Sequence, residues 1–158
     1  MKEEKGVGST KQVVFKLGQE EYGLDILIVN VIESYNGVIP VPNSPDYILG
    51  ILNLRGEVIP VFSLRVKFGL PEIQTSTEQL IVTRTNGMMV GFKVDAVCGI
   101  VEFSERELSE VPMIVKSEKT KYAKQVANKN DKMIILLDHE GILNDREQAS
   151  IQQALEAN

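Results

Sequence analysis

The chain repeats part of its own pattern, and this repeat limits the folds it can adopt. Residues 23–26 (GLDI) align with residues 91–94 (GFKV), which places Val29 opposite Val97. Residues 53–62 then align with residues 128–137, with apolar side chains at matching positions. We therefore expect two similar units of about 60–70 residues, the size of small β-barrels. Units this small bury little surface alone, so they should pack together through an apolar seam.

The units should be built mainly from strands. Short runs rich in Val and Ile alternate with turn residues, a pattern typical of β structure. Runs 13–17 and 22–25 predict one hairpin, and runs 80–85 and 88–94 predict another around an Asn-Gly pair, which favours a type I′ turn. Continuous apolar runs, such as 58–62, indicate strands buried on both faces.

Few helices are expected, and all of them are short. Ser44 followed by proline can begin a helix that ends near Gly50. Ser104 and Glu107 have the spacing of a capping box, which indicates a helical turn before a proline. The segment 144–158 begins with the same spacing and predicts a C-terminal helix.

Composition narrows the class of partner. The net charge is -5 and the only cysteine is Cys98, which together disfavour nucleic acid, anionic membranes and disulfides. Residues 1–10 contain no apolar core, and no apolar run approaches the roughly 18 residues of a membrane span. We expect a cytoplasmic protein with a solvated N-terminal arm, no direct membrane insertion and a lysine-rich segment, 116–132, that is mostly an exposed loop.

The sequence contains no recognisable catalytic constellation. Phosphate-binding loops and nucleophile elbows are missing. His139 is interpreted as a solvated residue at a strand end, because zinc sites usually need three or four ligands. Cys98 is interpreted as a small core residue. We therefore expect a binding protein with no metal and no cofactor; a nucleic-acid-binding pair of β-barrels and a small enzyme using Cys98 or His139 are the alternatives.

Residues 53–61 (NLRGEVIPV) resemble the N-L-R-G-x-x-I-P-V signature of the CheW family of chemotaxis coupling proteins. Residues 21–26, 40–45, 90–95 and 133–138 resemble further family segments in the same order, so the resemblance covers about residues 11–145. One departure is Gln125, where the family usually has a glycine.

The resemblance implies a mainly β fold of two five-stranded SH3-like barrels packed side by side. The first barrel would span about 20–79 and the second about 80–143, with a leading strand, 11–17, at the seam. It also implies a non-enzymatic adaptor that couples the cytoplasmic hairpin tip of a chemoreceptor to the regulatory domain of the histidine kinase CheA. An adaptor of another chemosensory pathway is the alternative within the family.

The resemblance further implies two binding sites. The family's receptor groove lies between the barrels, and the residues carried over to it are Val13, Ile26, Val29, Ile32, Gly50, Arg55 and Val97. The kinase contact, barrel to barrel, is assigned to Val38, Ile39, Val41, Ile48, Ile51 and Leu52. Each set has a structural alternative, since the apolar residues could be ordinary core, Arg55 could tie its own loop, and the glycines could serve the backbone alone.

Overall fold

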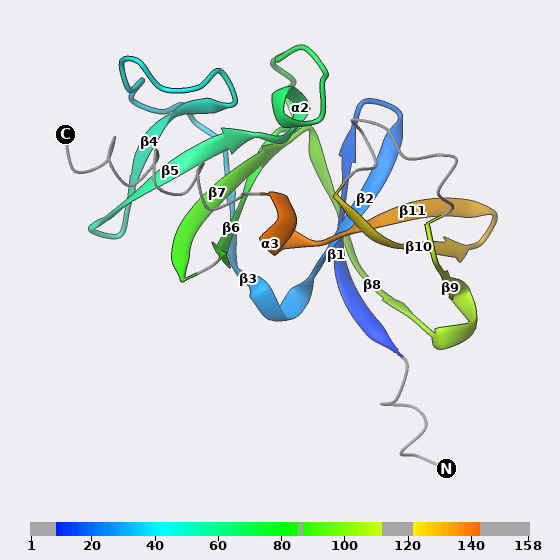
Figure 1. The fold of residues 1–158 in the computed structure, drawn as a ribbon. Helices are drawn as coiled ribbons and strands as arrows, with labels where there is room; N and C mark the ends of the chain where they lie inside the picture. The colour runs from blue at the N-terminus through cyan, green and yellow to red at the C-terminus, as the bar shows by residue number, and fades with distance from the viewer. Residues whose placement is uncertain (1–8, 86, 112–121, 143–158) are drawn as a thin grey trace.

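The computed structural model describes residues 9–85, 87–111 and 122–142, and two β-sheets dominate it. One sheet has the order β3 (Val29–Ser34), β6 (Gln79–Thr85), β7 (Met88–Val94), β5 (Glu57–Ser63), β4 (Ile48–Leu54). The other has the order β8 (Ala96–Phe103), β1 (Thr10–Leu17), β2 (Glu20–Asp25), β11 (Lys132–Leu137), β10 (Ala123–Lys129), β9 (Leu108–Ser109). The short helices are η1 (Ile26–Ile28), α2 (Leu64–Lys67), η2 (Glu105–Glu107) and α3 (His139–Ile142). Figure 1 shows the two sheets side by side, which confirms the expected fold class.

The sheets divide the chain differently from the expected barrel boundaries. The five-stranded sheet uses the continuous segment 29–94, here called the insert unit. The other sheet, with six strands rather than five, uses segments 10–25 and 96–137, here called the flanking unit. The hairpin β6–β7, which we expected in the second barrel, therefore lies in the first sheet, and β2 lies in the opposite sheet from the one expected. The chain crosses between the units at η1 and at Asp95.

Parallel strand pairing explains this division. Strand β5 pairs with β7, with Val61 opposite Gly91, and β11 pairs with β2, with Leu136 opposite Gly23. These two pairings are equivalent under the sequence repeat, because Gly23 aligns with Gly91 and Leu136 with Val61. Each repeat therefore places its first hairpin in the sheet of the other repeat. The repeat is real, but the units formed in space exchange hairpins.

The two equivalent glycines allow leucine side chains to pack closely against the backbone of these paired strands. A Cβ atom added at Gly23 would lie 2.9 Å from Leu136 Cδ2, and one added at Gly91 would lie 2.9 Å from Leu80 Cδ1. Neither distance is tolerated without movement of a buried leucine. Glycine is thus favoured here by close approach rather than by a turn, since any side chain would displace the end of a leucine.

The main core, here called the seam core, lies between the two units, as the expected seam requires. Strand β1 contributes Val13, Phe15 and Leu17 to this cluster, and the insert unit contributes Phe62 and Phe92 among others. Aromatic rings connect the units, since Tyr22 of the flanking unit lies 5.3 Å from Phe68 of the insert unit between ring centroids. Each sheet also has a smaller core on its other face. The units are therefore packed as one body.

Several local expectations can now be compared with the structure. The hairpin at 80–94 is confirmed by the pairing of Thr85 with Met88. The Ser104–Glu107 capping box is confirmed, because the Ser104 N–H donates to Glu107 Oε1 over 2.8 Å at the start of η2. Runs 58–62 and 133–137 form strands, although the first residue of each run is exposed.

Two other local expectations were wrong, and one concerns residues that the structure does not describe. No helix forms at 44–50; the Ser44 hydroxyl donates to the Val41 carbonyl over 2.8 Å in a turn, and β4 begins at Ile48. Residues 123–129 of the lysine-rich segment form the strand β10 rather than a loop, and residues 116–121 lie outside the described residues. The expected C-terminal helix, 144–158, lies outside the described residues.

Candidate functional site

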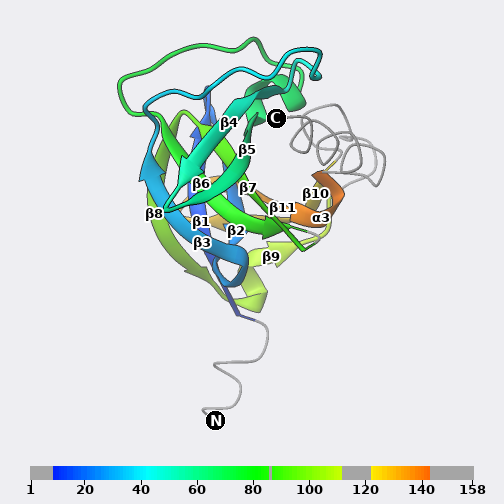
Figure 2. The same ribbon diagram turned by 90° about the vertical axis from the view of Figure 1, so that its left-hand side faces the viewer.

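Most residues assigned to the receptor contact gather along the seam between the units. Ile26, Val29, Ile32 and Val97 are partly buried, and all four pack against the seam core. Val29 and Ile32 lie on β3 and Val97 lies on β8, the edge strands of the two sheets (Figure 2). Ile26 lies in η1, where the chain crosses between the units. Val13 lies beneath them and is fully buried, so it supports this surface but cannot offer a contact of its own.

One residue of this surface, Ile100, was missed by sequence reasoning. It pairs with Val13, while Val97 pairs with Phe15, and the register shifts between these two pairs. Directly opposite residues of an antiparallel pair point to the same face, so Ile100 shares the face of Val97 and is 58% exposed. Simple alternation from Val97 would place Ile100 on the other face. Gly99, with a φ of 137°, marks the bulge that changes the phase and was the available signal.

These five residues define what we call the seam surface: Ile26, Val29, Ile32, Val97 and Ile100. Leu27 of η1 is next to Ile26 in the chain and is among the most exposed large apolar residues described. Its N–H is held by Asp25 Oδ1 over 2.9 Å, which fixes the turn that carries it. The result is a partly exposed apolar strip with side chains from both sheets.

Arg55 lies beside this strip rather than within it. It has a φ of 53° and is followed by Gly56, with a φ of 88°, in the turn between β4 and β5. The turn is closed by a hydrogen bond from the Gly56 N–H to Asn53 Oδ1 over 2.9 Å. Arg55 Nη2 lies 3.2 Å from Glu33 Oε2 on β3, yet the arginine side chain is 70% exposed. Its head is thus tied loosely to β3 and remains accessible.

Gly50 lies apart from the seam surface, because β4 and β3 are opposite edge strands of the five-stranded sheet. It lies in β4 at a register shift, and an added Cβ would lie 2.3 Å from the carbonyl oxygen of Ile39. That carbonyl accepts a hydrogen bond from the Ile51 N–H over 2.8 Å, and the Ile39 N–H donates to the Ile51 carbonyl over 2.9 Å. Gly50 therefore allows the segment around Ile39 to lie on β4.

The same contact organises part of the kinase set. Ile39 is 67% exposed, and Val38, Ile51 and Leu52 are partly buried. Val38 and Leu52 pack against the smaller core of the insert unit, so Ile39 is the main exposed member of the group. We call these four residues the bridge surface. Val41 and Ile48 are buried, and Ile48 is part of the seam core, so neither is available for a contact. The structure thus brings four of the six assigned residues together on the insert unit.

The remaining chemistry is sparse in the part of the chain that the structure describes. No group of three His, Cys, Asp or Glu side chains is placed there to hold a metal ion. Cys98 was expected in the core but is exposed on β8. Partial burial, together with the nearby charge of Glu21, raises the pKa of its thiol, which disfavours a reactive thiolate. His139 is the first residue of α3 and is partly exposed.

Comparison with known proteins identifies a family and several relatives. The CheW-like domain family matches residues 11–147. The chain is 33% identical over 140 residues to the chemotaxis protein CheW of Klebsiella aerogenes, covering 88% of this chain and 84% of that protein. It is 35% identical over 130 residues to the chemotaxis protein CheW of Helicobacter pylori, covering 82% of this chain and 78% of that protein.

A solved structure agrees with these sequence matches. The crystal structure of the scaffolding protein TtCheW from Thermoanaerobacter tengcongensis has a TM-score of 0.80 and 32% sequence identity, covering 87% of this chain and 94% of that chain. Within the described residues, no helix has the length and apolarity needed to cross a membrane. The chain belongs to the CheW-like domain family.

Proposed function

We propose that this protein is a non-enzymatic, cytoplasmic chemotaxis adaptor that couples chemoreceptors to the kinase CheA. The observation that carries the proposal is the presence of two separate, partly exposed apolar surfaces on one packed body, in a chain that belongs to the CheW-like family. An adaptor needs two contacts that can be occupied at the same time. The positions of the seam surface and the bridge surface support this, because β3 and β4 are opposite edge strands of the five-stranded sheet.

The seam surface is proposed as the receptor contact. Its partner would be the cytoplasmic hairpin tip of a chemoreceptor, which presents an apolar stripe of helical periodicity to Ile26, Val29 and Ile100. A strip of branched aliphatic side chains suits a helix laid along it. The exposed guanidinium of Arg55 beside β3 can add a forked contact to a receptor carboxylate.

The bridge surface is proposed as the contact with the regulatory domain of CheA. Ile39 projects from a segment that two backbone hydrogen bonds to Ile51 hold on the edge of the sheet. A protruding apolar residue on a fixed backbone loses little entropy on binding. Such a contact can be modest in area and still be specific.

A matched pair of substitutions tests the receptor assignment. Ile100→Asp and Met133→Asp both place a carboxylate at an exposed apolar position, since Ile100 is 58% and Met133 is 61% exposed. Both variants should fold, but only Ile100→Asp places its charge in the proposed contact. Burying an unpaired carboxylate there should cost about 2 kcal/mol or more, which is roughly 30-fold in affinity.

The measurement is titration of each variant with a receptor tip fragment, together with a pull-down using the CheA regulatory domain. We expect Ile100→Asp to lose receptor binding and keep kinase binding, and Met133→Asp to keep both. Equal receptor affinity for Ile100→Asp and the wild-type protein would show that the contact lies elsewhere.

A further inference from the structure

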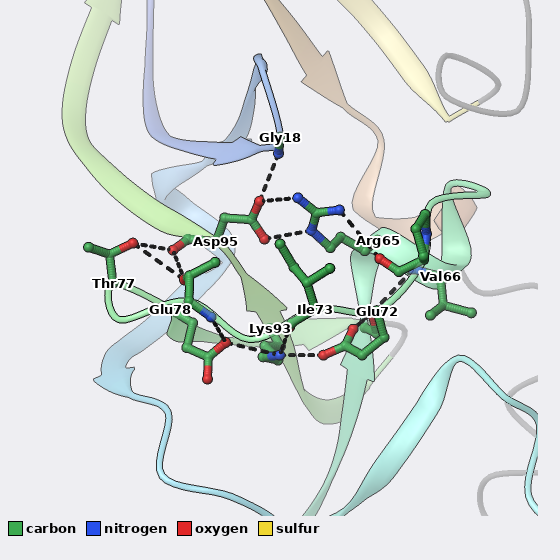
Figure 3. A network of polar contacts seen from close by, with 12 residues as sticks. Gly18, Arg65, Val66, Glu72, Ile73, Thr77, Glu78, Lys93 and Asp95 are labelled. Atoms are coloured by element: carbon green, nitrogen blue, oxygen red, sulfur yellow. Dashed lines mark hydrogen bonds and ion pairs between the residues drawn. The ribbon is translucent and has the colours of Figure 1, made fainter.

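Asp95 is the single residue between β7 and β8, where the chain passes from the insert unit to the flanking unit. Its carboxylate accepts hydrogen bonds from Arg65 Nε over 2.9 Å and from Arg65 Nη2 over 2.7 Å. The same carboxylate accepts the Gly18 N–H over 2.7 Å, and the Asp95 N–H donates to the Lys16 carbonyl over 3.1 Å. Figure 3 shows Asp95 between Gly18 and Arg65.

These contacts join the two units from opposite sides. Lys16 and Gly18 belong to the β1–β2 hairpin of the flanking unit, whereas Arg65 lies in α2 of the insert unit. The Arg65–Asp95 pair is mostly shielded, with side-chain exposures of 13% and 17%. A forked, shielded pair of this kind holds a defined geometry better than a single exposed ion pair does.

A second polar network lies next to the first and is centred on Lys93 of the insert unit. Residues 71–78, here called the strap, connect α2 to β6 within the insert unit. Lys93 Nζ pairs with Glu72 and lies 3.1 Å from Glu78 Oε2, and Glu72 also accepts a hydrogen bond from Ser63 (Figure 3). All of these partners belong to the insert unit. The strap also meets the crossing, because the Thr75 and Thr77 hydroxyls donate to the Asp95 carbonyl over 3.1 and 2.8 Å. Glu78 pairs with Lys93 instead, so Glu78→Gln perturbs the nearby packing and leaves the hydrogen bonds of the Asp95 carboxylate in place.

We propose that Asp95 and Arg65 are positioning residues that set the angle between the two units, and through it the shape of the seam surface. The seam surface depends on this angle because Val29 and Ile32 belong to the insert unit, whereas Val97 and Ile100 belong to the flanking unit. The link is short, since Val97 follows Asp95 by two residues. The expected effect on receptor binding rests on the proposed function, whereas the expected effect on the angle between the units does not.

The native cysteine allows the angle to be measured directly. Cys98 is exposed on β8 of the flanking unit, and Glu57 is exposed at the start of β5 in the insert unit. Spin labels on Cys98 and on a Glu57→Cys substitution report the distance between the units by double electron–electron resonance. In the same background we compare Asp95→Asn, Arg65→Lys and, as the strap control, Glu78→Gln.

We expect Asp95→Asn to shift or broaden the distance distribution. Arg65→Lys should have a smaller effect of the same kind, because lysine keeps the charge but lacks the fork. Glu78→Gln should leave the distribution unchanged even if it lowers the melting temperature. Receptor affinity should fall about tenfold in Asp95→Asn, within the range typical of coupling between separate sites, and should be unchanged in Glu78→Gln.

Three results would overturn the proposal. The first is a folded Asp95→Asn and Arg65→Lys pair whose distributions match the wild-type protein. The second is a Glu78→Gln distribution displaced as far as that of Asp95→Asn. The third is a displaced distribution with unchanged receptor affinity. If the wild-type protein itself did not bind the receptor tip, the proposed function would fail, while the distance measurement would still decide the role of Asp95.

Discussion

Arg55 and Asn130 have the same backbone conformation at equivalent points of the two repeats, each with a φ of 53°. Arg55 and Gly56 form the two-residue turn between β4 and β5, and Asn130 and Asp131, with a φ of 64°, form the turn between β10 and β11. Two positive φ values in succession define a type I′ hairpin, which favours Asn and Gly. Arginine is a poor choice at the first position, so the turn itself does not explain why Arg55 is there.

We therefore expect Arg55→Asn to keep or slightly raise the melting temperature while weakening the assembly of receptor tip, adaptor and kinase domain. Asparagine suits a positive φ better than arginine does. The lost Glu33 pair contributes little because the Arg55 side chain is 70% exposed. Thermal melting and a three-component pull-down on the same sample make the test.

The equivalent turn supplies the control for Arg55. Asp131→Gly also improves a type I′ turn, but it lies on neither proposed surface, so it should raise the melting temperature and leave the assembly intact. A fall of several degrees in Arg55→Asn, which corresponds to about 1 kcal/mol or more, with normal assembly would place Arg55 in the scaffold instead.

Gly50→Ala should damage the bridge surface selectively. The new Cβ would meet the Ile39 carbonyl oxygen at 2.3 Å, and this contact is with backbone, so it cannot be relieved by a rotamer change. We expect the segment around Ile39 to move off β4, with a loss of about 1–3 kcal/mol in the free energy of unfolding. CheA binding should weaken, and receptor binding, measured on the same preparation, should stay normal. Weakened receptor binding with normal kinase binding would assign Gly50 to the receptor contact.

The local elements of this fold could be predicted from the sequence, but their partners in space could not. Apolar runs and turn residues identify strands, because alternation and turn chemistry are local properties. Pairing between β2 and β11 joins segments more than 100 residues apart, and the local pattern of neither segment identifies the strand with which it pairs. The repeat therefore predicted two units correctly, yet the expected boundary near residue 79 fell inside one sheet.

Residues near the candidate site were misplaced where local geometry overrides simple patterns. The bulge at Gly99 changes the phase of β8, so simple alternation assigns Ile100 to the wrong face of the strand. Ser44 and Pro45 favour a helix start, but they form a turn, which leads directly into β4 and buries Ile48 in the seam core. In both cases the deciding contact is made with a residue that the local pattern does not include.

Cys98 offers a direct check on the exposed face of β8. We expect it to react fully with a maleimide in the folded protein, because it is exposed, but slowly near neutral pH. Partial burial first, and then the charge of Glu21, raise the pKa of the thiol and reduce the thiolate fraction. The reaction rate against pH should show a midpoint above that of a free thiol, and Glu21→Gln should move it downward. Protection of Cys98 until the protein unfolds would return it to the core.

The pKa of Asp95 makes its role testable by pH. Burial acts to raise this pKa, but the hydrogen bonds from Arg65 and Gly18 outweigh burial, and the charges of Arg65 and Lys93 act in the same direction, so the pKa is lowered. A carboxyl with a lowered folded-state pKa contributes its stability above its unfolded pKa of about 4 and loses it as the pH falls through the folded-state pKa. The wild-type protein should therefore be more stable than Asp95→Asn near neutral pH, and the difference should shrink on acidification below about pH 4.

Denaturant unfolding of the wild-type protein and Asp95→Asn at a series of pH values measures this difference. Arg65→Met provides the control: removal of the guanidinium should return the pKa of Asp95 toward its ordinary value and flatten the pH dependence of the same difference. The distance between labels at positions 57 and 98 should follow the same course, with the wild-type distribution approaching that of Asp95→Asn in acid. A stability difference that stays constant through the acid range would mean that the Asp95 charge does not hold the two units together, and that the tie depends on the shape of the side chain alone.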